Sequence, residues 1–466
     1  MLVVFLFVAV SSIITGSAHA SFEKAMEIYT AGRFEEAKIA FETMAAIGDS
    51  SSLFNLGVMY FRGEAVDSDP VRAYVLMKIA NEGVNNEAFS KTAQAVFSKL
   101  SEEQKQNVDK FYNEINQIYG HESIEDNIFP TLLDDKDCPP DLKPLHIEAP
   151  IYPKSELRSG RMGLVHAEIT ISPEGYPREI NVTSSTSKAF TKATIKGLNS
   201  YLYPPTLNKK PKGKQHVTTY RVDIKSGTKV RTKAILRELE VLKAKSEEGD
   251  VVAQFLYGRS LNTYRRFNDF LKNQNFQYRE ANEWYTKSAS GGLVNAQFEI
   301  GRNMLEGRGC KVDMENGFKW VKAAAVGGYS PAQKYLATSE IFGVSVTKNK
   351  AKSIVSWLRN AAQDEKYNYS SKLLLAWELV ASPEKSLLNA DEALILLKND
   401  PYTFSDDLRI LETRAAAFAL KNDFNKAVKL QTKATELARK KKWKIPKVFE
   451  RLDLYKRSQT YIGAYY

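Results

Sequence analysis

The sequence predicts an α+β protein in which solenoids of helical hairpins flank a small domain of strand, strand, helix and strand. Small and aromatic residues recur about every 36 positions in the second half of the chain, which is typical of stacked helix pairs. Residues 150–226 instead contain runs of alternating apolar and polar residues, the pattern of half-buried strands. With 466 residues, 43% hydrophobic and 26% charged, the chain has enough apolar mass for several domains.

Residues 1–20 fit the pattern of a secretory signal peptide. Residues 2–10 are apolar but too few to span a bilayer, and Ala18-His19-Ala20 fits the small-x-small cleavage site. No Lys or Arg precedes the apolar run, which departs from the usual pattern. We expect the signal to be removed, so that the mature chain begins at Ser21 outside the cytoplasm. A retained signal would instead anchor the protein in the inner membrane.

The formal net charge of +11 would ordinarily favour a nucleic-acid partner. Outside the cytoplasm, however, anionic envelope components and acidic proteins are the better match for this charge, so we expect no nucleic acid. The two cysteines, Cys138 and Cys310, lie in different segments, and a disulfide framework is not indicated. Two unpaired thiols are favoured over a bridge between them.

Residues 21–128 are expected to form helical repeats. Small and aromatic residues stand at helical spacing on both sides of Gly32, which predicts a hairpin over residues 21–47, and residues 53–83 repeat the design. Residues 129–149 contain four prolines and an acidic cluster, so we interpret them as a linker.

The clearest repeats lie at residues 227–380. Residues 295–327, with Ala296-Gln297, Gly301 and Trp320, resemble the Sel-type repeat, a relative of the tetratricopeptide repeat. We interpret Trp320 as a residue that fills a hairpin rather than as a binding aromatic, because one tryptophan recurs per repeat.

Residues 381–466 are expected to form further hairpins that resemble tetratricopeptide repeats, with helices at 390–397, 408–420 and 423–439. The basic run at residues 439–442 is interpreted as a solvated helix end rather than as a site for an anionic partner.

The central block, residues 150–226, changes period along its length. Strands are expected at residues 162–172, 179–184 and 217–224, with Gly175 in the turn between the first two. Residues 188–202 have helical period, and residues 209–214 form a basic loop. In the first strand the apolar side chains face one way, and these are Val165, Ala167, Ile169 and Ile171.

This block resembles the C-terminal domain of TonB, the periplasmic end of an energy transducer for outer-membrane receptors. The resemblance rests on Tyr152-Pro153, Gly163, Gly175, Phe190 and the run 201–205. It implies that an extended peptide adds as a strand to the exposed last strand. The residues that would recognise the peptide are Tyr152, Pro153, Thr219, Tyr220, Arg221 and Asp223. The alternative is that the outward side chains only protect an edge strand from aggregation.

No enzyme motif is found, and the five histidines are scattered without metal-ligand spacing, so we expect no catalytic residues, no metal and no cofactor.

The sequence favours a non-enzymatic, protein-binding protein of the Gram-negative periplasm that is associated with TonB-dependent transport. Its expected partners are segments of outer-membrane receptors or motor components, and it would meet membranes only through them unless its signal is retained. The alternative is a general envelope scaffold that uses the TonB-like fold for other protein interactions. A third hypothesis, an accessory to an enzyme, is the least favoured.

Overall fold

A computed structural model describes residues 21–139, 143–159, 163–205, 212–220, 232–265, 275–341, 349–364, 368–398 and 407–465. The predicted signal peptide therefore lies outside the described residues. Two compact units make up the chain, and neither is continuous in sequence. The repeat unit comprises Ser17–Pro140 and Lys229–Gln333, and the sheet unit includes Asp141–Thr228 and Lys334–Tyr466. Within the described residues, no helix has both the length and the apolar character that a bilayer crossing requires.

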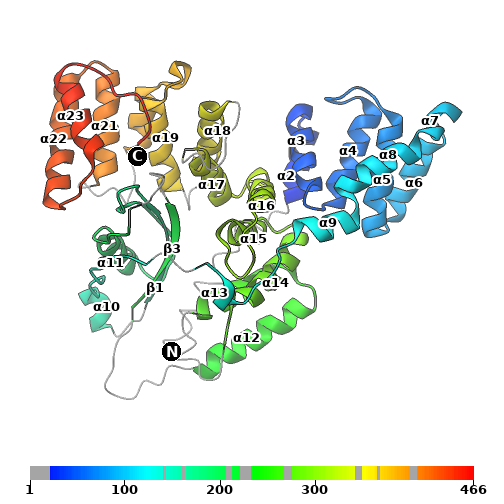
Figure 1. The fold of residues 1–466 in the computed structure, drawn as a ribbon, viewed down its shortest axis with the longest axis horizontal. Helices are drawn as coiled ribbons and strands as arrows, with labels where there is room; N and C mark the ends of the chain where they lie inside the picture. The colour runs from blue at the N-terminus through cyan, green and yellow to red at the C-terminus, as the bar shows by residue number, and fades with distance from the viewer. Residues whose placement is uncertain are drawn as a thin grey trace. The chain divides into compact units, whose positions relative to one another are not determined.

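The repeat unit is built from helices in its two parts (Figure 1). Its first part holds α2 (Ser21–Thr30), α3 (Phe34–Ala45), α4 (Ser50–Arg62), α5 (Pro70–Val84), α6 (Glu87–Phe97), α7 (Glu102–Gln106), α8 (Val108–Tyr119), α9 (His121–Ile128) and the short helix η1 (Asp135–Asp137). Its second part holds α12 (Thr232–Glu247), α13 (Val251–Tyr264), α14 (Tyr278–Ser290), α15 (Val294–Glu306) and α16 (Met314–Val326). The division between the units falls within α17 (Ser330–Ile341).

Local sequence explains where these helices begin and end. Asp69 and Asp313 accept hydrogen bonds at the starts of α5 and α16 and so satisfy backbone donors that lack a helical partner. Gly63 and Gly307 end α4 and α15 in the left-handed conformation that glycine adopts without strain. The predicted turn at Gly32, with φ of +74°, separates α2 from α3, so the hairpin predicted there is confirmed.

The two parts of the repeat unit share one core. α16 packs against α2 and α3. The backbone N–H of Ser21 donates to the carbonyl of Gly292 at 3.2 Å, and the Gln297 side-chain amide donates to the Ser21 hydroxyl at 3.1 Å. The helical segments at 21–128 and 251–326 therefore pack together, although the 122 residues from 129 to 250 separate them in sequence.

Part of the predicted linker is held against the repeats. The backbone N–H of Leu133 donates to the Gly309 carbonyl at 2.9 Å, and the N–H of Lys311 donates to the Thr131 carbonyl at 2.8 Å. The Trp320 indole N–H donates to the Ile128 carbonyl at 3.0 Å. Residues 129–139, which we call the strap, are thus not a free spacer as the proline content suggested, because the backbone groups of Thr131 and Leu133 pair with the repeats.

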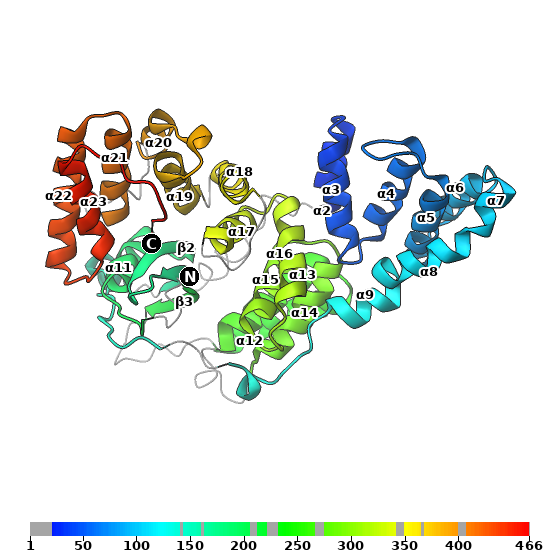
Figure 2. The same cartoon turned by 45° about the horizontal axis from the view of Figure 1, so that its top comes forward.

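The sheet unit contains a three-stranded antiparallel sheet in the order β2-β1-β3 (Figure 2). Its strands are β1 (Gly163–Ile171), β2 (Pro177–Ser185) and β3 (Lys212–Tyr220), and its helices are α10 (Lys154–Arg158) and α11 (Lys188–Leu198). The remaining helices are α18 (Lys350–Ala362), α19 (Asn368–Ala381), η3 (Lys385–Leu387), α20 (Ala390–Leu396), α21 (Leu408–Leu420), α22 (Phe424–Lys440) and α23 (Pro446–Lys456). The described residues are mainly helical, and their strands all belong to this one sheet.

The buried face of the sheet is the one that alternation predicted. Val165, Ala167, Ile169 and Ile171 on β1 are all at most 2% exposed, and α11 packs against β1 and β2. The predicted helix 188–202 ends earlier, at Leu198, because Leu202 leaves the helix and pairs with His146 as an isolated bridge.

The predicted strand 217–224 differs from β3 at its beginning. β3 begins at Lys212, within the residues predicted as a basic loop, because residues 212–216 pair with β1 through their backbone and need no apolar alternation to do so. Residues 221–224 of the prediction lie outside the described residues.

Candidate peptide-binding edge

The pairing of β1 with β3 runs without a register shift from Gly163↔Tyr220 to Ile171↔Lys212. The pairing of β1 with β2 shifts register between His166 and Ala167 and between Thr170 and Ile171. A regular strand presents a regular row of backbone donors and acceptors on its outer side. Of the two outer strands, β3 therefore offers the more regular row of backbone groups to an added strand.

The outer strands also differ in what lies beside them. β2 packs against α11 and against α19, whereas β3 packs extensively only against β1 among the described elements. A strand at the end of a sheet keeps alternate N–H and C=O groups available for another chain. The described part of the sheet thus leaves β3, rather than β2, as the edge to which an extended peptide could add.

Tyr152 lies at the end of the sheet where β1 begins. Its ring meets the buried Phe190 edge-on, with 5.5 Å between the ring centroids. A Cβ at Gly163 would lie 2.2 Å from the same Phe190 ring, so the backbone of β1 needs glycine there. Because Gly163 pairs with Tyr220, the structure brings Tyr152 and the last described residues of β3 to the same end of the sheet.

Tyr152 and Pro153 have structural roles of their own. Burial raises the pKa of Tyr152, as does the nearby charge of Glu156, so its hydroxyl remains protonated at neutral pH. Pro153 stands at the N-cap of α10, and its carbonyl accepts from the N–H of Leu157 at 2.9 Å. The Tyr-Pro pair therefore attaches α10 to the sheet.

The recognition residues predicted from the sequence are only partly placed. Thr219 and Tyr220 form the end of β3, opposite Leu164 and Gly163. Arg221 and Asp223 lie outside the described residues, so their outward orientation stays a prediction. The structure brings Tyr152, Pro153 and the end of β3 to one region.

Sequence reasoning missed the contribution of Glu156, which lies in α10. Its side chain is 7% exposed and accepts from the Ser187 hydroxyl at 3.1 Å. The same hydroxyl accepts from the N–H of Phe190 and so caps α11. Glu156 thereby connects α10 to the start of α11, and the signal for this contact, a carboxylate 31 positions from its partner, is not local in sequence.

The opposite end of the sheet is attached to the C-terminal helices. The turn at Gly175, with φ of +94°, is followed by Tyr176, whose hydroxyl accepts from the N–H of Lys444 at 3.2 Å. The Tyr176 and Trp443 rings lie 6.2 Å apart. These contacts attach the β1–β2 turn to the segment between α22 and α23.

The chemistry available at the β3 edge is that of the peptide backbone. Within the part of the chain that the structure describes, no group of three or more His, Cys, Asp or Glu side chains is placed to hold a metal ion. The edge can exchange hydrogen bonds with another strand, and Tyr152 adds an aromatic surface nearby.

Comparison with known families gives two matches. Residues 148–225 match the model of the Gram-negative bacterial TonB protein C-terminal family. Residues 50–83, 251–293 and 294–329 match the Sel1 repeat. Both resemblances inferred from the sequence are confirmed, and the match at residues 50–83 covers the hairpin of α4 and α5.

Among solved structures, a Sel1 repeat protein from Oxalobacter formigenes is 32% identical, with a TM-score of 0.25, over 30% of this chain and 97% of the other. A protective antigen of uropathogenic Escherichia coli that displays an SLR fold is 15% identical, with a TM-score of 0.33, over 93% of this chain and 83% of the other. No match was found among curated proteins.

Proposed function

Because this chain carries Sel1 repeats around a segment that matches the TonB C-terminal family, we propose that it is a periplasmic protein-binding protein whose β3 edge captures an extended partner segment. The observation that carries the proposal is the pairing of β3 with β1 along its whole described length, without a second described strand on its other side. Backbone hydrogen bonds would supply the affinity, and side chains at the Tyr152 end would supply the selectivity.

The Sel1 repeats support a role in holding proteins. Both family matches describe domains that mediate protein interactions, and a stacked solenoid offers an extended surface for a partner. The periplasmic location is part of the proposal and is supported by the signal-like residues 1–20. N-terminal sequencing of the mature protein tests it, since a start at Ser21 is expected and an intact Met1 would contradict removal of the signal.

Proline substitutions at adjacent positions of β3 test the edge directly. Successive N–H groups of a strand point to opposite sides, so one of Val217→Pro and Thr218→Pro removes a donor facing β1 and the other a donor facing outward. We expect the first kind of variant to lose stability. The second should remain folded and lose its partners in co-purification from envelope fractions.

The two variants serve as controls for each other, because they differ by one position in the same strand. The variant with the lower melting temperature is the one that has lost the donor facing β1. Mass spectrometry of the co-purified proteins measures binding. Equal recovery of partners by the stable variant and by the unsubstituted protein would contradict strand addition at β3.

The partner class is proposed to be segments of outer-membrane receptors or components of their motor. Recovery of these proteins supports an association with TonB-dependent transport. Recovery of other envelope proteins, with binding still lost in the proline variant, would favour the scaffold hypothesis instead.

A further inference from the structure

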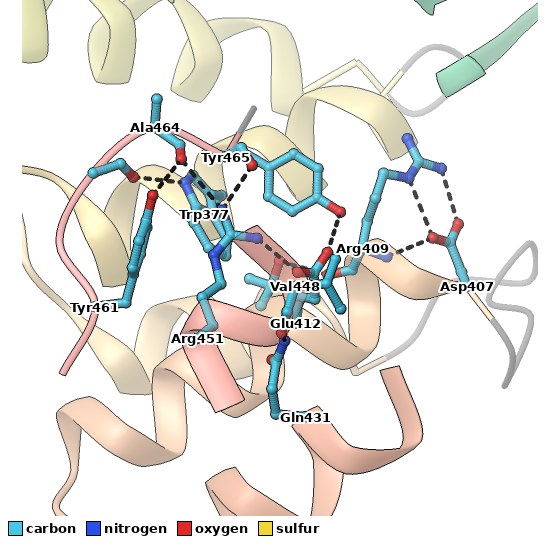
Figure 3. A network of polar contacts seen from close by, with 12 residues as sticks. Trp377, Asp407, Arg409, Glu412, Gln431, Val448, Arg451, Tyr461, Ala464 and Tyr465 are labelled. Carbon is cyan, nitrogen blue, oxygen red and sulfur yellow. Dashed lines mark hydrogen bonds and ion pairs between the residues drawn. The ribbon is translucent and has the colours of Figure 1, made fainter. Parts of the chain in front are cut away.

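A second peptide-recognising arrangement lies within the C-terminal helices, separate from the β3 edge. Residues 461–465, Tyr-Ile-Gly-Ala-Tyr, form no helix or strand and lie against α19, α21 and α23 (Figure 3). We call them the YIGAY segment. Trp377 on α19, Glu412 on α21 and Arg451 on α23 converge on it, each from a different helix.

The backbone of the YIGAY segment is recognised at three consecutive residues. The N–H of Gly463 donates to the Ala381 carbonyl at 2.8 Å, and its carbonyl accepts from the Trp377 indole at 3.2 Å. The Arg451 guanidinium donates to the carbonyl of Ala464 at 3.3 Å and to that of Tyr465 at 2.7 Å. Such contacts recognise an extended peptide whatever its side chains are.

Two side chains of the segment add selectivity. The Tyr465 hydroxyl donates to the Glu412 carboxylate at 2.8 Å, and the Tyr465 ring meets Trp377 edge-on at 4.8 Å. The Tyr461 ring centroid lies 4.5 Å from the Arg451 guanidinium carbon. Ile462, in contrast, is 46% exposed. Tyrosines four positions apart are thus recognised, and the residue after the first is not.

Gly463 is required for this conformation. Its φ is +144°, a backbone conformation that residues with a side chain rarely adopt. A Cβ at this position would also lie 3.2 Å from the Tyr461 hydroxyl oxygen. The recognised motif is therefore Tyr-x-Gly-x-Tyr.

The floor of the site has an unusual composition for a helical core. Arg451 and Glu412 form an ion pair of 2.6 Å, and both side chains are fully buried. Two buried charges lose their hydration, which is unfavourable unless hydrogen bonds replace it. The YIGAY segment supplies these bonds, through two carbonyls to Arg451 and one hydroxyl to Glu412. Convergent polar groups within aromatic walls are typical of a ligand site.

We propose that α19, α21 and α23 form a binding site for an extended Tyr-x-Gly-x-Tyr peptide, and that the chain's own residues 461–465 occupy it as an intramolecular ligand. A partner segment with the same motif binds when the YIGAY segment is displaced. The intramolecular copy has an effective concentration of about millimolar, so it keeps the site closed to weak competitors.

Deletion of residues 459–466 from the full chain opens the site for a direct test. The probe is a fluorescein-labelled peptide with the sequence of residues 459–466, and binding is followed by fluorescence anisotropy. We expect the chain that lacks residues 459–466 to bind the peptide saturably at one site. The affinity of the intact chain for the peptide should be at least about tenfold lower because of the intramolecular competitor. The proposal would be overturned if circular dichroism shows that the truncated chain is folded and this chain does not bind the peptide at about 1 mM.

Variant peptides test the motif. Tyr465→Phe removes a hydrogen bond to a charged acceptor, and we expect about tenfold weaker binding or more. Gly463→Ala should weaken binding as well, whereas the control Ile462→Ala should bind as the unsubstituted peptide does. Equal affinities for all four peptides would contradict the recognition described above.

If the truncated chain does not fold, peptide binding to variants of the full chain tests the proposal instead. In the full chain, Gly463→Ala loosens the intramolecular segment, and we expect it to increase peptide binding by about tenfold relative to the control Ile462→Ala. No increase in a folded Gly463→Ala chain would overturn the proposal.

Discussion

Gly301 sets the distance between two helices of a Sel1 repeat. A Cβ at this position of α15 would lie 2.8 Å from the Gly317 carbonyl oxygen and 2.8 Å from the Cβ of Trp320 on α16. Such distances are shorter than side-chain atoms adopt, so only glycine allows the two backbones to approach this closely. The small residue that the repeat pattern places at position 301 thus has a steric reason.

Gly301→Ala is expected to destabilise the repeat unit by about 1–3 kcal/mol, because the added methyl group overpacks the α15–α16 contact. Urea unfolding followed by circular dichroism measures the loss. Lys322→Ala, at an exposed position of α16, is the matched control and should change stability by less than about 0.5 kcal/mol. Equal effects of the two substitutions would contradict the steric explanation.

Glu378 on α19 gives a pH-dependent prediction. Burial raises its pKa from 4.5 to about 7, although the nearby charge of Lys350 opposes the shift. The folded protein then binds a proton that the unfolded chain releases between pH 4.5 and 7. Stability is expected to fall as pH rises through this window, by about 3 kcal/mol at most.

Glu378→Gln should remove this dependence and raise the melting temperature at pH 8 more than at pH 5. The substitution Glu436→Gln, at an exposed position of α22, serves as the control. If Glu378→Gln has the same melting temperature as the unsubstituted protein at both pH values, burial of the ionised Glu378 carboxylate is not the cause of the fall in stability with pH.

Among the elements, the strap binds the repeats, although its composition had favoured a linker. Asp135 accepts from the N–H of Tyr278 at 2.8 Å and from Arg265 at 3.2 Å, and Asp134 accepts from Arg279 at 3.0 Å. The N–H of Gly309 lies 3.1 Å from the sulfur of Cys138, and Cys138 and Cys310 are both free thiols. Acidic residues that look like a solvated linker therefore bind the repeats.

Asp135→Ala is expected to loosen the strap, since it removes two hydrogen bonds, one of them to a charged group. Hydrogen exchange at the Lys311 amide, which donates to Thr131, should become about tenfold faster or more. Asp137→Ala is the control, because Asp137 is exposed in the same short helix. Unchanged exchange in Asp135→Ala would show that other contacts hold the strap.

At the scale of the whole molecule, each compact unit combines segments that are distant in sequence. The first hairpin, α2 and α3, packs on α16, and the strap crosses the same repeats. The residues between Pro140 and Lys229 belong to the other unit. A solenoid can accept such an insertion because each repeat needs only its neighbours in space.

This arrangement predicts that the two parts of the repeat unit associate when they are separate chains. Residues 21–140 and 229–333, produced together, should co-purify as a one-to-one complex. Trp320→Ala should weaken the complex, since it removes the hydrogen bond to Ile128 and leaves a cavity. Size-exclusion chromatography with light scattering measures the association, and separate elution of the unsubstituted fragments would contradict a shared core.

Local patterns predicted the elements that depend on local chemistry. The alternation in residues 162–172 predicted β1 and its buried face, and the turns predicted at Gly32 and Gly175 have the positive φ that glycine adopts without strain. α21 was predicted to within its observed bounds, since its apolar period and its flanking residues agree. β3 was predicted five residues too short at its beginning, because residues 212–216 form a strand through pairing with β1 alone.

The candidate sites divide in the same way. Tyr152-Pro153 and the end of β3 could be proposed from the TonB-like motif, and the structure brings them to one end of the sheet. The site of the YIGAY segment could not, because Glu412, Arg451 and Tyr465 have no shared local pattern. Their pairing depends on how three helices pack, at separations of 39 and 53 residues from Glu412.

The sequence by itself determined the helical hairpins, the strands with alternating residues and the two family resemblances, since periodicity and turn residues act over a few positions. Only the tertiary structure decided that the strap binds the repeats, that β3 is the regular outer strand and that residues 461–465 occupy a polar site. These features depend on contacts between distant segments, and the energy of burying a charge or pairing a strand edge appears only once the chain has folded.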